Sequence, residues 1–122
     1  MNIIECYTDC SYSPQTGLLV IGYKIGDLEI VTELLQNIKN TQGEIYAVEK
    51  VINTCDKNYP NCEIIIYTDC QRVIKNNYQN VNFIKVKGHS KKIFKNKNDL
   101  IFSTVDKRVR KELRKYVKNI EK

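Results

Sequence analysis

Hydrophobic residues in the first third of the chain form short runs that are rich in β-branched side chains. These runs predict β-strands over residues 2–7, 18–25 and 28–35. Turn-forming residues separate the first two strands at residues 11–17, and residues 26–27 form a tight hairpin turn. Because both connections are short, we expect these three strands to be antiparallel.

From Glu44 onwards the spacing of the apolar residues changes to that of a helix. The residues at this spacing are Ile45, Ala47, Val48, Val51, Ile52 and Cys55. Asn40 or Thr41 can cap the start of the helix, and Pro60 stops any continuation. Glu44 is therefore expected in the first turn.

Two further strands and two further helices follow. Residues 63–68 form an apolar run typical of a strand at the centre of a sheet, and residues 81–87 alternate as another strand. Asp69 can cap a short helix that runs to about Asn76. The last helix, which Ser103 can cap, has an apolar stripe composed of Val105, Val109, Leu113, Tyr116, Val117 and Ile120.

This order of elements defines the expected fold. Strands that are reached through a helix are normally parallel, with a right-handed crossover. The chain is thus predicted to be an α/β protein with a five-stranded mixed sheet, three antiparallel strands followed by two parallel strands, flanked by helices. A length of 122 residues suits one domain that spans residues 1–122.

The tetrapeptide Tyr-Thr-Asp-Cys occurs twice, at residues 7–10 and 67–70. Asp9 and Asp69 are predicted to end two neighbouring strands, where a carboxylate close to the core needs a cation. Glu44 could reach the same point from the helix. Several carboxylates in one small site require a metal, and Mg2+ prefers oxygen ligands. Two such ions can clamp the attacking and leaving oxygens of a phosphodiester.

The formal charge of +6 is concentrated in two parts of the chain. Residues 85–97 contain lysines and no acid, and the last helix adds Lys107, Arg108, Arg110, Lys111, Arg114, Lys115 and Lys118. Such a field attracts polyanions, and nucleic acid is the partner that it favours. For any single lysine, a solvated surface position is the alternative interpretation.

The cysteines and the lack of a membrane segment indicate a compartment. The 5 cysteines include no Cys-x-x-Cys pair, which argues against a disulfide framework or a zinc site. No apolar run approaches the roughly 18–20 residues that a membrane span needs, and the N-terminus lacks the pattern of a secretory signal. We expect a soluble protein of an intracellular, reducing compartment, cytoplasmic or nuclear, with no membrane partner.

Four segments occur in a characteristic order along nearly the whole chain. They are Tyr-Thr-Asp-Cys-Ser at 7–11, Gly-Glu-Ile-Tyr-Ala-Val at 43–48, Tyr-Thr-Asp-Cys-Gln at 67–71 and Val-Lys-Gly-His-Ser at 86–90. Together they resemble the ribonuclease H family, type 1, of the ribonuclease H-like superfamily. The resemblance implies a ribonuclease H-like fold and a metal-dependent endonuclease that hydrolyses the RNA strand of RNA–DNA hybrids by a two-metal mechanism. It also implies two Mg2+ ions, for which Mn2+ can substitute, and recognition of 2′-hydroxyls in a wide minor groove.

The resemblance further implies roles for individual residues. The positions that match the family's metal-binding, catalytic carboxylates are Asp9, Glu44 and Asp69. His89 matches a catalytic histidine that assists proton transfer or product release. Asn40 and Gln71 match polar residues that contact the nucleic acid near the cut. We add Lys87, from the lysine-rich stretch, to the expected substrate-binding residues.

The last catalytic and metal-binding carboxylate is either Asp106 or Asp99. Asp99 lies ten residues after His89, a spacing similar to that of many family members. Asp106 follows the possible Ser103 cap, so we expect it in the first turn of the last helix, where the positive end of the dipole favours an anion. We prefer Asp106 for this reason.

Two cysteines depart from the family pattern. Cys10 stands where a glycine is common, and Cys70 stands where a serine is common. They leave open an alternative function, a catalytically weak or inactive nucleic-acid-binding module with the same fold. A related nuclease for junctions or single strands is a third interpretation, against which Gly88 and His89 argue. We expect an RNA–DNA hybrid as the partner, no obligate protein partner and a monomer.

Overall fold

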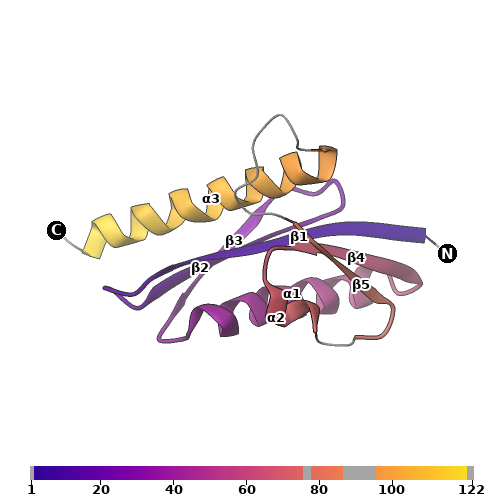
Figure 1. Ribbon diagram of the computed structural model, residues 1–122, viewed down its shortest axis with the longest axis horizontal. Helices are drawn as coiled ribbons and strands as arrows, with labels where there is room; N and C mark the ends of the chain where they lie inside the picture. Colours follow the sequence, from indigo (N-terminus) through magenta and orange to yellow (C-terminus); the bar gives the residue numbers. More distant parts are fainter. Residues whose placement is uncertain (1, 76–77, 87–95, 121–122) are drawn as a thin grey trace.

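Strands and helices follow one another in the predicted order (Figure 1). The computed structural model describes residues 2–75, 78–86 and 96–120. Its strands are β1 (Asn2–Ser13), β2 (Leu18–Ile25), β3 (Val31–Gln36), β4 (Cys62–Thr68) and β5 (Val81–Lys85). Its helices are α1 (Asn40–Asn58), α2 (Gln71–Ile74) and α3 (Lys97–Ile120).

The strands form one five-stranded sheet in the order β3-β2-β1-β4-β5. β1 pairs with β2 and β2 with β3 in antiparallel fashion, whereas β1 pairs with β4 and β4 with β5 in parallel. The predicted fold class is therefore confirmed. α1 and α2 lie against one face of the sheet and α3 lies along the other (Figure 1). None of the helices in the described part of the chain is long and apolar enough to cross a membrane.

The parallel pairing of β1 with β4 brings the two copies of the tetrapeptide together. Its register pairs Cys6 with Ile66 and Tyr7 with Tyr67, so residues whose numbers differ by 60 lie side by side. The rings of Tyr7 and Tyr67 stack with centroids 5.0 Å apart and an interplanar angle of 14°. Both tyrosines are buried, as expected of core aromatics.

Each face of the sheet is covered by a different hydrophobic cluster. On one face, Val48 and Val51 of α1 pack with Ile64 and Ile66 of β4. On the other face, the buried residues of α3 are Phe102, Val105, Val109 and Leu113. Three residues of the predicted stripe follow Leu113 and are less covered: Val117 is half-buried, and Tyr116 and Ile120 are exposed.

Two glycines allow the helices to approach β2 closely. A Cβ atom on Gly43 of α1 would lie 2.6 Å from Cδ2 of Leu19, and a Cβ atom on Gly22 of β2 would lie 2.2 Å from Cγ1 of Val109. Real side chains do not approach so closely, so a larger residue at either position would push a helix away from the sheet. Gly43 directly precedes Glu44, and its small size therefore sets how near that carboxylate comes to the strands.

β1 is longer than predicted, because it continues past residue 7 to Ser13. Antiparallel pairing with β2 extends to the pair Ser13 and Leu18, so the ladder holds the polar residues 11–13 in strand conformation. Asp9 consequently lies inside a strand, and the prediction that it ends one is wrong. β3 starts later than predicted, at Val31, where its pairing with β2 begins.

α1 starts with Lys39 as its N-cap, so the prediction that Asn40 or Thr41 caps it is wrong. Oε1 of Gln42 accepts a hydrogen bond of 3.0 Å from the backbone N–H of Lys39, which is half of a capping box. Glu44 is the fifth residue of α1 and lies in the second turn, not the first.

α2 is also capped by a different residue than predicted, Cys70 in place of Asp69, and it ends at Ile74. Asp69 is therefore outside the helix, between the end of β4 and the cap. The last residues of β4, and not the helix, therefore set the position of its side chain.

α3 starts at Lys97, well before the predicted cap at Ser103. The backbone N–H of Asn96 donates to Oδ2 of Asp99 at 3.2 Å, and the N–H of Asp99 donates to Oδ1 of Asn96 at 2.8 Å. These two bonds satisfy donors that a helix start leaves without partners. Asp106 therefore lies in the third turn of α3, and the expectation that it sits at the positive end of the dipole is wrong.

Candidate active site

The site forms where β1 and β4 diverge. The parallel pairing ends at Tyr7 and Tyr67, after which β4 stops at Thr68 while β1 continues in partnership with β2. Asp9 stays in the sheet opposite Gly22, and Asp69 leaves it. The two aspartates thus project from neighbouring strands beyond the last parallel pair.

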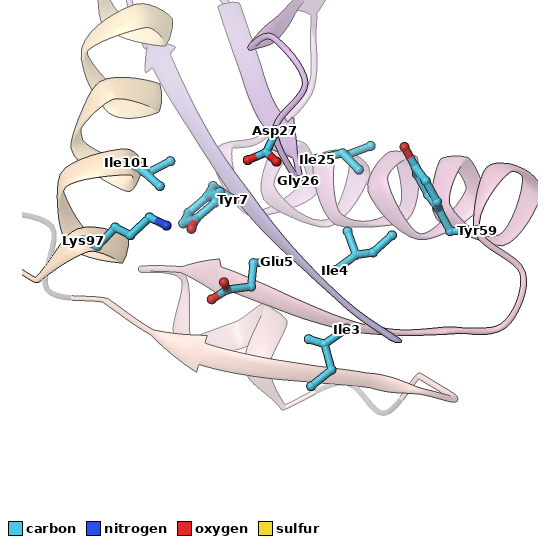
Figure 2. A pocket seen from close by; sticks show the side chains of 10 residues that line it. All are labelled: Ile3, Ile4, Glu5, Tyr7, Ile25, Gly26, Asp27, Tyr59, Lys97 and Ile101. Atoms are coloured by element: carbon cyan, nitrogen blue, oxygen red, sulfur yellow. The ribbon is translucent and has the colours of Figure 1, made fainter. Parts of the chain in front are cut away.

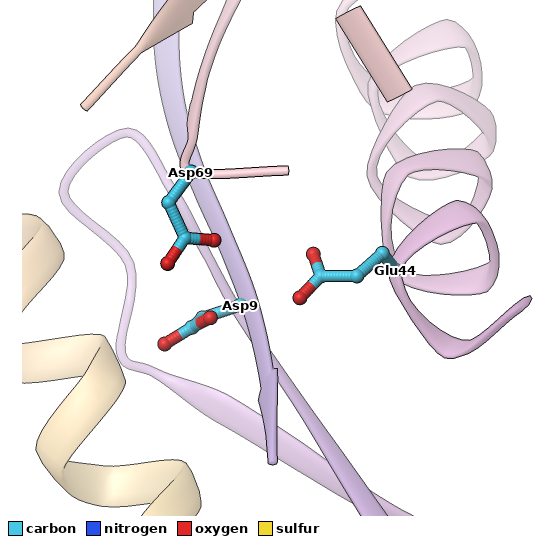
Figure 3. Close-up of side chains that lie close together, drawn as sticks. All are labelled: Asp9, Glu44 and Asp69. Carbon is cyan, nitrogen blue, oxygen red and sulfur yellow. The ribbon is translucent and has the colours of Figure 1, made fainter. Parts of the chain in front are cut away.

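Three carboxylates converge at this point, one from β1, one from α1 and one from the residue that follows β4 (Figure 3). Ligand oxygens of Asp9, Glu44 and Asp69 all lie within 4.8 Å of one another. Asp9 is 3% exposed and Glu44 is 5% exposed, whereas Asp69 is open to solvent. The cluster therefore has a buried floor and an accessible rim.

Burial strongly disfavours the charged form of the two inner carboxylates. Desolvation raises the pKa of Asp9 to about 10, with further contributions from its hydrogen bond with Asp106 and from the charges of Asp69 and Glu44. Desolvation also raises the pKa of Glu44 to about 7, although a hydrogen bond from Cys10 opposes this shift. Without a cation, burial therefore favours the protonated, neutral forms of Asp9 and Glu44.

The unpaired oxygens of the cluster fit a divalent cation. Oδ2 of Asp9 and Oε2 of Glu44 are buried and find no hydrogen-bond partner among the residues that the structure describes. Buried polar atoms normally have hydrogen-bond partners. A cation bound between these two carboxylate oxygens would supply the interaction that both of them lack. A donor set made only of carboxylate oxygens suits a hard ion such as Mg2+ or Mn2+.

The two candidates for the last carboxylate have different surroundings. Asp106 shares a hydrogen bond with Asp9, and its Oδ2 accepts a bond of 2.7 Å from Nη2 of Arg110. Asp99 instead closes the reciprocal cap with Asn96 at the start of α3. Asp106 thus borders the cluster, whereas the carboxylate of Asp99 is engaged in the start of the helix.

Comparison with known families agrees with this geometry. The sequence model of the RNase H family matches residues 1–118. The chain belongs to the RNase H family. No curated protein matches the sequence at a significant level.

Solved structures with the same fold include several RNase H1 proteins. LC11-RNase H1, isolated from compost by a metagenomic approach, has 15% identity and a TM-score of 0.63, over 93% of this chain and 99% of that one. The same enzyme in complex with an RNA/DNA hybrid matches with 15% identity and a TM-score of 0.57, over 68% of this chain and 84% of that one. Prototype foamy virus protease-reverse transcriptase matches with 17% identity and a TM-score of 0.64, over 85% of this chain but only 20% of that one.

Cys10 has a specific place in this RNase H family chain. Its thiol donates a hydrogen bond of 2.8 Å to Oδ1 of Asn40, which joins β1 to the first residue of α1. Burial raises the pKa of the Cys10 thiol, and the neighbouring charge of Glu44 raises it further. The thiol is therefore a neutral donor to Asn40 that lies beside Glu44, a role that the sequence pattern did not suggest.

Of the remaining residues with predicted roles, the structure describes Gln71 but not Lys87 or His89. Gln71 is exposed at the start of α2, and its Oε1 accepts a bond of 3.3 Å from Nζ of Lys85. Lys87 and His89 lie outside the described residues. Their roles in substrate binding and catalysis stay predictions.

A separate cavity of about 350 Å³ lies between the first half of β1 and the start of α3 (Figure 2). Glu5, Asp27 and Lys97 line it together with isoleucine side chains. Oε2 of Glu5 already accepts a hydrogen bond of 2.6 Å from the hydroxyl of Tyr67. The cavity contains none of the clustered carboxylates and is not part of the candidate active site.

Proposed function

We propose that this protein is a metal-dependent endonuclease that hydrolyses the RNA strand of RNA–DNA hybrids. The observation that carries the proposal is the convergence of Asp9, Glu44 and Asp69, with their ligand oxygens within 4.8 Å and two of those carboxylates buried. Membership of the RNase H family supports it, as does the likeness to an RNase H1 solved with an RNA/DNA hybrid.

In the proposed site, the three clustered carboxylates together with Asp106 would hold two Mg2+ ions. Bound there, divalent cations supply Lewis-acid activation of water and neutralise charge at the phosphate. The buried Asp9 and Glu44 hold the floor of the site in a fixed position, because the surrounding core restricts their rotamers. Asp69, at the exposed rim, faces the side from which a substrate arrives.

Other residues of the chain bind the substrate and handle protons in this proposal. Asn40, Gln71 and Lys87 contact the hybrid close to the cut, and the position of Asn40 is held by the Cys10 thiol. His89 assists proton transfer or product release. The protein acts as a monomer on a hybrid that it recognises by the shape of the minor groove.

The direct test is cleavage of a hybrid whose RNA strand carries a 5′ label. The protein should cut the RNA with Mg2+ or Mn2+, and Asp69→Asn should abolish the cleavage. Asp56→Asn on α1, an exposed aspartate outside the cluster, is the matched control and should cut like the unaltered protein. If the folded protein fails to cut with either metal, the proposal is wrong.

One observation favours a second candidate, a binding module with weak or no activity. Cys10 occupies the position after the first aspartate, and its thiol contacts the residues that would hold metal and substrate. Such a module would bind the hybrid in a salt-dependent manner without product formation. Binding and cleavage measured on the same labelled hybrid separate the two functions.

A further inference from the structure

The cations of α3 divide into those with an acidic partner and those without one. Arg108 and Lys115 both pair with Glu112, and Arg110 pairs with Asp106. Five exposed basic residues of the helix form no ion pair with any described residue. One is Lys97, which begins the helix and lines the separate cavity; the other four lie further along, at Lys107, Lys111, Arg114 and Lys118. Their charge is available to a partner.

These four side chains lie on one side of α3, and we call them the outer stripe. They follow one another at intervals of four, three and four residues, which confines them to roughly 60° of the helix circumference. The buried residues Phe102, Val105, Val109 and Leu113 occupy the opposite side and face the sheet. The outer stripe therefore points away from the sheet, and all four of its residues are exposed.

The length of the outer stripe suits a nucleic acid backbone. It runs over twelve residues from Lys107 to Lys118, which is eleven steps along the helix or about 16 Å. One strand of a duplex presents a phosphate about every 3.4 Å along its axis, so about five phosphates lie within that length. Four cations in a row over this distance match the charge density of one strand.

The alternative anionic partner, a membrane surface, is less favoured. An amphipathic helix that lies on a bilayer inserts its apolar side chains between the lipids. The apolar side of α3 is packed on the sheet from Phe102 to Leu113, and only its end, with Tyr116 and Ile120, is exposed. The outer stripe itself consists only of basic residues.

The start of the outer stripe is next to the candidate active site. Lys107 directly follows Asp106, whose carboxyl is hydrogen-bonded to Asp9, and the helix then leads away from the carboxylates. We propose that the outer stripe is a second nucleic-acid-binding surface, which contacts the phosphate backbone of a strand that extends beyond the site of cleavage. The choice of nucleic acid as the partner rests on the proposed function, whereas the existence of an anion-binding surface does not.

The test compares two double variants of the full chain with equal changes in charge. Lys111→Gln/Lys118→Gln removes half of the outer stripe. Lys50→Gln/Lys57→Gln is the matched control, because both lysines are exposed on α1, on the opposite face of the sheet. The probe is a fluorescently labelled single-stranded DNA, and its dissociation constant is measured by anisotropy at several salt concentrations in EDTA.

The stripe variant should bind more weakly at low salt, and the slope of log K against log salt should be less steep by about 1.4, the value for two lost contacts to a single strand. The control should keep the slope of the unaltered protein. Equal slopes for the two variants would overturn the proposal. If the stripe variant does not fold, Lys107→Gln/Arg114→Gln provides the same comparison.

Two further measurements distinguish the possible failures. If no protein cuts the labelled hybrid in Mg2+ or Mn2+ but the stripe variant alone has a reduced slope, the outer stripe stands and the proposed function fails. If the hybrid is cut and the slopes are equal, only the outer stripe fails. Loss of binding to phosphatidylserine-containing vesicles, with unchanged DNA binding, would assign the surface to membranes and overturn the proposal.

Discussion

Tyr7 and Tyr67 stack with ring centroids 5.0 Å apart, as register partners on adjacent parallel strands. Each tyrosine stands two residues before an aspartate, so the same register carries Asp9 and Asp69 to the same level of the sheet. The strands separate after this pair, because β4 ends and β1 continues. The stacked pair is therefore the last pair of residues that the two parallel strands share. It sets the positions from which the side chains of Asp9 and Asp69 extend.

Metal binding should stabilise the protein through Asp9. Mg2+ or Mn2+ at about 100 times its dissociation constant should raise the free energy of unfolding by about 2.7 kcal/mol. In Asp9→Asn this response should be lost, while the metal-free protein should become more stable by about 1–4 kcal/mol at pH 7, because a buried carboxyl with no cation is removed. Denaturant unfolding in EDTA and in metal measures both effects. An unchanged metal response in Asp9→Asn would contradict this assignment, and Asp56→Asn is the control.

The stability of the metal-free protein should fall as the pH rises, through Glu44. Its pKa is raised from 4.5 to about 7, so the folded protein holds a proton that the unfolded chain releases between these values. The stabilisation is complete below about pH 4.5 and is lost as the pH approaches 7, a difference of about 3 kcal/mol. Unfolding of the protein and of Glu44→Gln in EDTA at several pH values isolates this contribution. Parallel pH curves for the two proteins would show that Glu44 does not titrate in this way.

Asp106 and Asp99 should respond differently to truncation. Asp106→Ala should reduce hybrid cleavage about 10–100-fold, because Asp106 supports Asp9. Asp99→Ala should keep the cleavage rate but lower the free energy of unfolding by about 1 kcal/mol, through loss of the bond from Asn96 to its side chain. Initial rates and melting curves of both variants make the comparison. The reverse pattern would assign the last site carboxylate to Asp99.

The Cys10 thiol should affect substrate binding more than turnover. Cys10→Ala removes the donor that holds Asn40, so KM for the hybrid should rise about fivefold, the equivalent of one hydrogen bond, with little change in kcat. Cys10→Ser keeps a donor at this position and should retain most of the affinity. Steady-state kinetics of the three proteins test this. Equal KM values for the alanine and serine variants would show that the hydrogen bond has no such role.

Gly43→Ala should destabilise the protein, although alanine is the better helix former. Its Cβ atom would meet Cδ2 of Leu19 at 2.6 Å, which should cost about 1–3 kcal/mol. The shift of α1 should also weaken the stabilisation by metal, because Glu44 is the next residue. Asn53→Ala, at an exposed position of the same helix, should leave stability nearly unchanged. Equal unfolding midpoints for the two variants would mean that Leu19 gives way at no cost.

The order of the elements was predictable because each depends on local periodicity. The change from alternating residues to helical spacing near Glu44, and the apolar run before Asp69, are properties of neighbouring positions. The antiparallel and parallel pairings then follow from the lengths of the connections. Element ends were not predictable in this way. β1 extends to Ser13 because β2 pairs with it, and α3 starts at Lys97, with Asn96 and Asp99 exchanging hydrogen bonds at its start.

The sequence by itself determined the order of the elements along the chain, the mixed sheet in which the two Tyr-Thr-Asp-Cys strands are neighbours, and the three carboxylates that converge. Only the tertiary structure decided that Asp9 and Glu44 are buried while Asp69 is exposed, that Asp106 contacts Asp9, and that the Cys10 thiol holds Asn40. The physical reason is that burial, orphaned oxygens and hydrogen bonds between distant elements depend on how closely the layers pack. That packing is set by residues such as Gly22 and Gly43, whose importance lies in the atoms opposite them and not in their neighbours along the chain.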